Sequence, residues 1–283
     1  MTFAVTGATG QLGRLVVSQL KERAPLDPIV AVVRNPEKAA DLGVTIRQAD
    51  YSDPAALETA FDGITTLLFI SASEMEGRFA NHSNVIDAAK KAGVGRIVYT
   101  SLLRADTTAI RVLADSHFQT EEYLKDSGID YTILRDGFYT EVYMGAIGAA
   151  LEHGVIIGSA GDARFATAGR TDFAAAAVAA MTGDGHSGKT YELAGSHPFT
   201  YHTLAAEIAR QSGQPVVYSN LDSKQHADVL AGRGMPAEVA QMLAGFDSAA
   251  AEGDLDGDDT DFVHLIGRKT TPLAEIVAGA LRP

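Results

Sequence analysis

The sequence contains no cysteine, and basic residues are scarce beside acidic ones. The absence of cysteine excludes disulfides, thiolate nucleophiles and thiolate metal ligands. Lys and Arg number 23 against 36 Asp and Glu, so the net charge of -13 argues against nucleic acid or an anionic membrane as partner. No run of about 18 apolar residues is present, and no basic segment precedes an apolar core of signal-peptide type. We therefore expect a soluble, cytoplasmic protein without a membrane span.

What is present favours an α/β fold in the first half of the 283 residues. Near-continuous apolar strand patterns alternate there with helix patterns, which is typical of a parallel sheet covered on both faces. The chain is expected to form a doubly wound (Rossmann) sheet whose ligand binds beyond the carboxyl ends of the strands. The expected strands are 29–33, 44–48, 65–70, 96–100 and 131–134, and the expected helices are 36–42, 54–61, 81–92 and 116–125.

The rhythm changes after about residue 135, where helices dominate. We expect a dinucleotide-binding domain over residues 1–150 and a smaller α/β lobe on the substrate side over 151–283. The boundary is soft, because the Ala-rich segment 171–182 is apolar nearly all round and is expected to return to the sheet. The other expected helices are 141–151, 201–211, 236–245 and 272–281, and the expected short strands are 155–157, 191–193 and 216–218.

A glycine-rich turn lies between the first expected strand and the helix that follows it. The apolar residues 3–5 lead into glycines at 7, 10 and 13, and Leu12 begins an apolar-periodic helix. Glycine lets the backbone bend tightly and approach a diphosphate, and the helix start directs free N–H groups to the same anion. The strand and helix on either side are the context that this motif requires, although an ordinary glycine-rich turn is the alternative.

The end of the second strand indicates which dinucleotide is bound. A site selective for NAD usually carries an acid there, whereas this chain has Arg34, whose guanidinium can pair with a 2′-phosphate. Arg14 could add a second positive charge, and Asp50 is a candidate partner for the adenine amino group or a helix cap. NADP(H) is therefore the favoured cofactor, with a solvated Arg34 as the alternative.

No metal site is expected. The eight histidines show no His-Glu-x-x-His spacing. Residues 252–261 contain six acids and resemble part of a calcium loop, but Asp259 stands at the glycine position and Leu265 at the glutamate position. We interpret this stretch as a solvated loop.

Six segments together carry a family resemblance: TGATGQLG (6–13), VRNP (33–36), QADY (48–51), NVIDAA (84–89), YTSLL (99–103) and YELAG (191–195). The chain resembles the NmrA-like atypical short-chain dehydrogenases and, among them, the bacterial type 2 NAD(P)H:quinone oxidoreductases. The similarity extends to TTPL at 270–273 and so covers nearly the whole chain. The glycine turn alone is shared by many reductases, whereas the combination is much more specific.

The resemblance implies a cofactor site built from four segments. It assigns the 2′-phosphate to Arg34, the nicotinamide side to Ser71, Ala72 and Ser73, and the diphosphate to Gly7, Ala8, Thr9, Gly10, Gln11 and Leu12. It assigns a segment that closes over the nicotinamide and meets the substrate to Arg135, Asp136, Gly137, Phe138, Tyr139 and Thr140. Related proteins often carry Asn before this glycine, so Asp136 departs from their pattern.

Two residues are candidate proton donors. None of the nine tyrosines has lysine four residues later, so the usual Tyr-x-x-x-Lys acid of dehydrogenases is absent. In the related isoflavone-reductase-like enzymes a catalytic lysine lies where this chain has His117, which therefore becomes a candidate, with a helix-surface histidine as the alternative. Tyr139 is the rival proton donor, with an aromatic wall for the quinone as the alternative. The hydroxyl of Ser101 could act as a cap or form a hydrogen bond to the substrate.

The expected function is transfer of a hydride from NADPH to a quinone in one two-electron step, without flavin or metal. A quinone needs little acid catalysis, because the charge it receives is delocalised over its ring, and the main demand is close stacking on the nicotinamide. NADH as a second coenzyme and a homodimer are left open. The alternatives are an NADP-sensing regulator without turnover and a reductase of another conjugated acceptor, such as a triphenylmethane dye.

Overall fold

A seven-stranded sheet organises the computed structural model, which describes residues 1–282. The strands follow the order β3-β2-β1-β4-β5-β6-β8 and every neighbouring pair is parallel. Their apolar runs are buried on both faces, as the near-continuous patterns predict. The strands are β1 (Phe3–Thr6), β2 (Ile29–Val33), β3 (Thr45–Gln48), β4 (Thr66–Phe69), β5 (Arg96–Leu102), β6 (Asp130–Asp136) and β8 (Lys189–Leu193).

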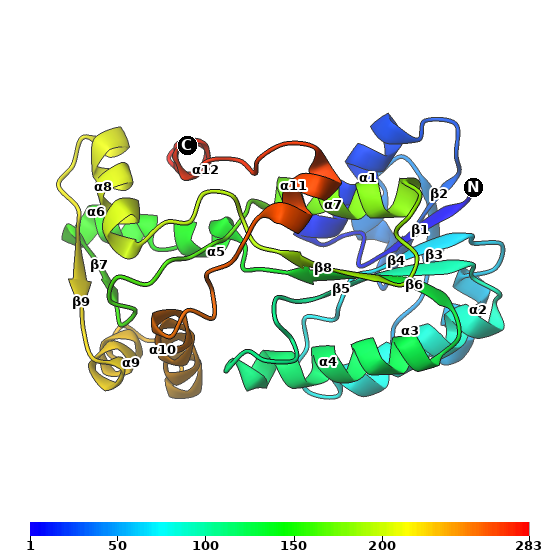
Figure 1. Cartoon of the computed structure of the whole chain (residues 1–283), viewed down its shortest axis with the longest axis horizontal. Coiled ribbons are helices and arrows are strands. Elements are labelled where there is room, and N and C mark those ends of the chain that lie inside the picture. Colours follow the sequence, from blue (N-terminus) through cyan, green and yellow to red (C-terminus); the bar gives the residue numbers. More distant parts are fainter. Residues whose placement is uncertain (283) are drawn as a thin grey trace.

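Helices cover both faces of this sheet, which confirms the doubly wound α/β fold (Figure 1). One face packs against α1 (Gln11–Arg23), α7 (Arg170–Thr182) and α11 (Thr260–Ile266). The opposite face packs against α2 (Pro54–Ala60), α3 (Arg78–Lys91) and α4 (Arg111–Asp126). The short turn of 3-10 helix η1 (Pro36–Ala39) follows β2 and is capped by the Asn35 side chain.

Segments beyond residue 150 return to the sheet. The Ala-rich helix α7 is buried along most of its length and packs against α1, as its all-round apolar composition predicts. β8 pairs with β6, in register Leu134 with Tyr191, and so forms the edge of the main sheet. The expected boundary at residue 150 therefore does not follow the sheet, because α7 and β8 lie beyond it in sequence and yet belong to the main sheet and its covering helices.

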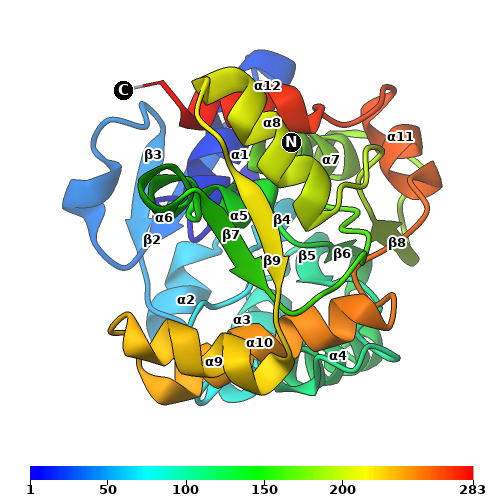
Figure 2. The same ribbon diagram turned by 90° about the vertical axis from the view of Figure 1, so that its left-hand side faces the viewer.

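The remaining elements form a smaller lobe at one end of the sheet (Figure 2). Its strands β7 (Val155–Gly158) and β9 (Val217–Asn220) are parallel and share an aromatic core with the neighbouring helices. One helix was expected over 141–151, whereas the structure has two, separated at Gly145, since glycine weakens a helix interior. The lobe helices are α5 (Thr140–Met144), α6 (Ile147–His153), α8 (Tyr201–Ser212), α9 (Ser223–Gly232), α10 (Ala237–Ala251) and α12 (Leu273–Ala280).

The acidic stretch after α10 is more than a solvated loop, which corrects the interpretation from sequence. Asp254 accepts hydrogen bonds from the Thr108 hydroxyl at 2.9 Å and the Ala109 N–H at 2.5 Å. Asp256 pairs with Arg164 at 3.0 Å. Asp254 thus ties this stretch to the segment after β5, and Asp256 ties it to the segment after β7; both contacts join residues distant in sequence.

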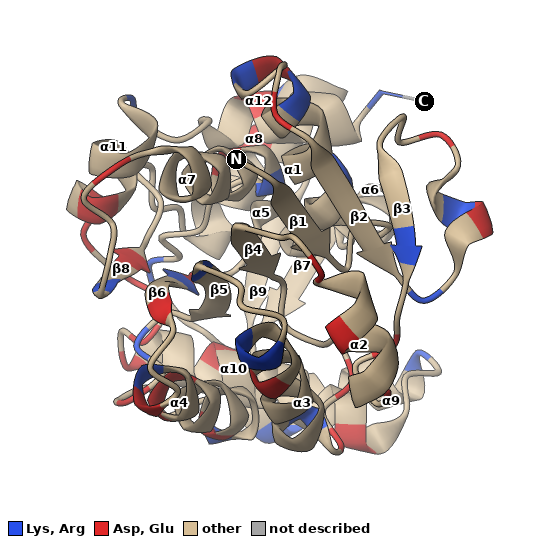
Figure 3. Ribbon diagram, turned by 90° about the vertical axis from the view of Figure 1, so that its right-hand side faces the viewer, with Lys and Arg blue, Asp and Glu red and all other residues tan. Residues whose placement is uncertain are grey.

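Charged residues lie on the helices outside the sheet and are absent from three of its strands. Figure 3 shows β1, β2 and β4 without charged residues, and acidic and basic residues on α3 and α4 beneath them. Among residues 1–282, no helix combines the length and apolarity needed to cross a membrane. The same residues contain no group of three or more His, Asp or Glu side chains arranged to hold a metal ion.

Candidate active site

A cavity of about 760 Å³ lies at the carboxyl ends of the strands. Its lining comes from the segments that follow β1, β2, β3, β4 and β6, with Arg170 added from the start of α7. This is the edge where doubly wound folds bind ligands. The residues expected from sequence that do line it are Gly7, Thr9, Gly10, Gln11, Leu12, Arg34, Ser71, Ala72, Ser73 and Tyr139.

The turn between β1 and α1 forms an anion cradle at one side of the cavity. Gly7 has a φ of 60°, and the Gly10 N–H donates to its carbonyl at 2.9 Å. A Cβ on Gly13 would lie 2.4 Å from the same carbonyl oxygen, so only glycine allows the helix to start this close to the strand. Helix α1 has no side-chain cap, which leaves the N–H groups of its first turn for an anion. The cradle therefore fits the diphosphate of a dinucleotide.

Two basic side chains line the cavity near the end of β2. Arg34 directly follows this strand, and Lys38 lies one turn further along, on η1. Arg14, the expected second cation, does not line the cavity: it pairs with Asp41 at 2.7 Å and donates to the Lys38 carbonyl. Arg14 thus holds η1 in place, and Lys38 supplies the second positive charge.

Arg34 forms an ion pair with Glu74 from the loop between β4 and α3. The Arg34 Nη1 and Glu74 Oε1 atoms are 2.8 Å apart, and the pair raises the pKa of Arg34 above its usual value. Asp50 also lines this end, with its Oδ1 atom accepting from the Ser52 N–H and hydroxyl. The helix cap that was an alternative for Asp50 is supplied by Asp53.

The loop after β4 is held by buried polar groups beneath it. The Ser71 N–H donates to the Thr100 hydroxyl at 3.0 Å, and the Ala72 N–H donates to His82 Nε2 at 2.9 Å. Burial is the main reason that the pKa of His82 falls to about 3, so its ring is neutral and can accept this bond. The backbone of this loop is therefore fixed against the cavity.

Tyr139 closes the other end of the cavity. The guanidinium carbon of Arg170 lies 4.5 Å from the centroid of the Tyr139 ring, and both residues line the cavity. Glu141 accepts a hydrogen bond from the Arg170 N–H at 2.9 Å, which fixes the start of α7 here. Burial raises the pKa of Tyr139, so its hydroxyl stays protonated. Tyr139 can therefore act as a flat apolar wall and as a weak proton donor.

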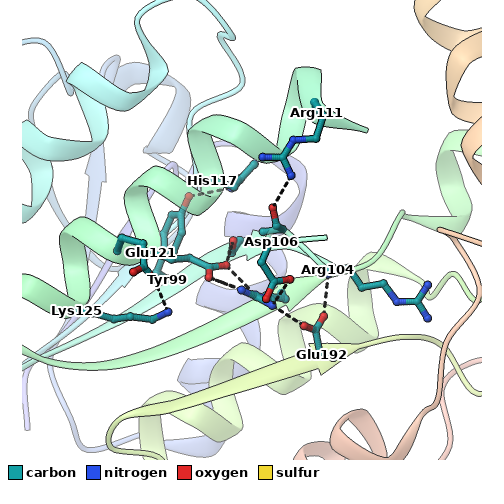
Figure 4. A network of polar contacts seen from close by, with 12 residues as sticks. Tyr99, Arg104, Asp106, Arg111, His117, Glu121, Lys125 and Glu192 are labelled. Atoms are coloured by element: carbon teal, nitrogen blue, oxygen red, sulfur yellow. Dashed lines mark hydrogen bonds and ion pairs between the residues drawn. The ribbon is translucent and has the colours of Figure 1, made fainter. Parts of the chain in front are cut away.

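Arg135 does not reach the cavity, contrary to the expectation from sequence. Its guanidinium binds the fully buried Glu121 on α4, with Nη2 and Oε2 2.7 Å apart, and Glu192 on β8 at 2.8 Å. Figure 4 shows Glu121 and Glu192 pointing into this network. Burial alone would lower the pKa of Arg135, but hydrogen bonds with Glu121 and Glu192 outweigh it and raise the pKa. Arg135 therefore joins α4 to the sheet.

Other expected residues around Arg135 also lie outside the cavity lining. Asp136 is buried, and its Oδ1 atom has no hydrogen-bond partner among the described residues, so burial raises its pKa well above the usual range. The Phe138 ring packs on Phe246, and the Thr140 hydroxyl bonds to that of Thr167. Alternate residues of β6 face opposite sides of the sheet, which turns Arg135 and Asp136 away from each other. Ala8 and Gly137 are buried too.

His117 is buried on α4 and is not part of the cavity lining. Its Nδ1 atom lies 2.8 Å from the hydroxyl of Tyr99, as Figure 4 shows, and burial lowers its pKa to about 3. It is therefore neutral near pH 7, and this placement does not suit a proton donor. Ser101 is similarly engaged, donating to Glu121 at 2.5 Å.

Three charged cavity residues were missed from the sequence. Lys38 could have been suspected, because it follows Arg34 on an expected helix. Glu74 and Arg170 carried no local signal: they reach the cavity through the loop after β4 and through the return of α7 to the sheet.

Comparison with known proteins agrees with this geometry. The profile of a family described as NAD(P)H-binding matches residues 7–184. The chain is 51% identical to quinone oxidoreductase 2 of Escherichia coli, over 98% of this chain and 97% of that protein. The crystal structure of the NADPH-dependent quinone oxidoreductase QOR2 of Escherichia coli complexed with NADPH superposes with a TM-score of 0.95 at 50% identity. The match covers 99% of this chain and 100% of that one.

A second solved relative acts on a different acceptor. The triphenylmethane reductase of Citrobacter sp., complexed with NADP(H), has a TM-score of 0.93 and 37% identity, covering 99% of this chain and 100% of that one. The fold, the glycine cradle and these similarities agree over nearly the whole length. The chain belongs to the NAD(P)H-binding family.

Proposed function

We propose that this chain is an NADPH-dependent quinone oxidoreductase that acts by direct hydride transfer, without flavin. The observation that carries the proposal is the cavity itself, which joins a glycine cradle to two basic side chains, Arg34 and Lys38. The 51% identity with quinone oxidoreductase 2 supports a quinone as the acceptor.

Different segments of the cavity would bind different parts of the coenzyme. Backbone N–H groups of the first turn of α1 would hold the diphosphate, and Arg34 with Lys38 would hold the 2′-phosphate. The backbone of Ser71 and Ala72, fixed by Thr100 and His82, would border the nicotinamide. When bound there, NADPH supplies a hydride from C4 of its nicotinamide.

The chain then has to position the acceptor. Tyr139, supported by Arg170, offers a rigid aromatic surface at the end of the cavity. A protonated Tyr139 hydroxyl or water suffices to neutralise the reduced quinone, because its negative charge is delocalised. No buried acid is needed for this step, which agrees with the placement of His117 outside the cavity.

A direct assay tests the proposal. The purified full-length chain, shown to be free of flavin by its visible spectrum, is mixed with NADPH and a simple benzoquinone, and the loss of NADPH absorbance is followed. Turnover above the uncatalysed rate is expected. Calorimetric titration that detects binding of neither NADPH nor NADP⁺ would contradict the proposal.

The similarity to triphenylmethane reductase favours a second candidate acceptor, a conjugated cationic dye. The same assay with a triphenylmethane dye in place of the quinone separates the two candidates by the ratio of their kcat/KM values. Binding of NADPH without turnover of either acceptor would instead indicate a coenzyme-sensing protein.

A further inference from the structure

Two opposite charges face each other within the cavity. Arg34 follows β2, and Glu74 belongs to the loop between β4 and α3; both line the cavity. Their side chains pair at 2.8 Å while remaining 68% and 52% exposed. The pair lies at the end of β2, the position that reads the ribose 2′ substituent in this fold.

The backbone that carries Glu74 is anchored from below. Arg78, the first residue of α3, is only 5% exposed, and its Nε atom donates to the Glu74 carbonyl at 3.1 Å. Its two other guanidinium nitrogens bond to the Ser73 carbonyl at 3.4 Å and to the Ser116 hydroxyl at 3.3 Å. The backbone of residue 74 is therefore held beside Arg34.

We infer that Glu74 weakens the preference of this site for the phosphorylated coenzyme, because its carboxylate competes with the 2′-phosphate for Arg34. A phosphate at Arg34 has to displace or approach a like charge, which is unfavourable. A ribose 2′-hydroxyl carries no charge and can donate a hydrogen bond to a carboxylate, as at the acidic residue of NAD-selective sites. Arg34 thus favours NADPH, Glu74 favours NADH, and together they keep both coenzymes usable. The inference rests on the proposed function.

The effect is expected to be moderate, since both side chains are well exposed and water screens the pair. An exposed pair contributes up to about 1 kcal/mol, which corresponds to a change of about fivefold in an equilibrium constant. Lys38 also lines the cavity and has no ion pair within residues 1–282, so NADPH should stay the preferred coenzyme.

The test is the variant Glu74→Gln, which keeps the size of the side chain and removes its charge. Its matched control is Glu76→Gln, an exposed carboxylate of the same loop that, within residues 1–282, neither lines the cavity nor pairs with a base. Dissociation constants for NADPH and NADH are measured by calorimetry on the full-length chains, with melting curves to verify folding. For Glu74→Gln the ratio Kd(NADH)/Kd(NADPH) should rise about two- to fivefold. For Glu76→Gln it should stay at the wild-type value.

Two results would overturn the inference. Equal ratios in Glu74→Gln and in the wild type show that Glu74 does not discriminate between the coenzymes, while the proposed function stands. An equal rise in Glu74→Gln and Glu76→Gln shows only the general effect of loop charge. Failure of the wild-type chain to bind either coenzyme is a separate outcome, because it removes the proposed function itself and the inference with it.

Discussion

The guanidinium of Arg170 lies over the ring of Tyr139, with 4.5 Å between the guanidinium carbon and the ring centroid. This contact joins the start of α7 to the segment after β6 at the end of the cavity. A cation over an aromatic face restrains the ring and leaves the tyrosine hydroxyl free to form hydrogen bonds. The relationship explains how a residue 31 positions away in sequence can shape this part of the cavity.

If the ring is the essential feature of Tyr139, its hydroxyl can be removed at little cost. Tyr139→Phe should keep kcat/KM for a benzoquinone within about twofold, while Tyr139→Ala should lose about tenfold or more through poorer stacking. Steady-state kinetics with saturating NADPH measures both. Similar large losses in the two variants would show instead that the hydroxyl donates the proton.

Arg34 should discriminate between the coenzymes. Arg34→Ala removes charge-assisted hydrogen bonds to the 2′-phosphate, so kcat/KM for NADPH should fall about 10- to 100-fold. The value for NADH should change by less than about threefold, since its ribose carries no phosphate. Parallel assays with the two coenzymes measure the effect, and equal losses would contradict the role assigned to Arg34.

Gly13 is required by the close approach of α1 to the turn after β1. Gly13→Ala places a Cβ 2.4 Å from the Gly7 oxygen, so the helix start must shift. We expect a loss of about 1–3 kcal/mol in the free energy of unfolding and weaker NADPH binding. The control is Gly148→Ala on α6, where a Cβ meets nothing within 4 Å. An unaltered NADPH affinity in Gly13→Ala would contradict the cradle.

His117 should matter for stability and not for chemistry. The pKa values of His82 and His117 fall from the usual 6.5 to about 3 through burial, so the unfolded chain binds protons that the folded chain does not. Stability is then fully present above pH 6.5 and is lost as the pH falls towards 3, by about 1.4 kcal/mol per unit for each histidine.

The variant His117→Gln isolates one of these contributions. Urea unfolding is measured between about pH 5 and pH 8, a range that contains the usual histidine pKa. The free energy of unfolding should fall less on acidification in the variant than in the wild type. At pH 8, kcat should equal the wild-type value. A large fall in kcat with the fold intact would restore His117 as a participant in the reaction.

Asp136 should have the opposite dependence on pH. Burial raises its pKa, so the folded chain retains a proton that the unfolded chain releases above about pH 3.8, and stability is lost as the pH rises. The side chain introduced by Asp136→Asn is neutral at every pH. The melting temperature of this variant should therefore exceed that of the wild type by more at pH 8 than at pH 5. A difference that does not vary with pH would show that Asp136 is not neutral in the fold.

Local patterns were sufficient for much of the fold. The β-branched run predicted β2 with its observed bounds, Ile29–Val33, and the all-round apolar composition of α7 predicted its burial against the sheet. The glycine spacing and Arg34 indicated the cradle and the base that line the cavity. These features depend on neighbours within a few residues, where backbone conformation and side-chain periodicity are encoded directly.

Other features depended on partners far along the chain. β8 appeared from its sequence to belong to the smaller lobe, because nothing in its five residues specifies β6 as its neighbour. Helix α9 was not predicted at all. Arg135 looked like a cofactor ligand until Glu121 and Glu192 were seen to bind it.

The sequence by itself determined most strands of the main sheet, the glycine turn before α1 and the base that follows β2, since each is a short-range property of strand, turn and helix start. Only the tertiary structure decided which polar groups face the cavity and which are used in packing. It buried His117 and Arg135 among their partners and brought Glu74 to Arg34 and Arg170 to Tyr139. The physical reason is that a side chain's solvation and charge state depend on what the fold places beside it, and that information is spread over the whole chain.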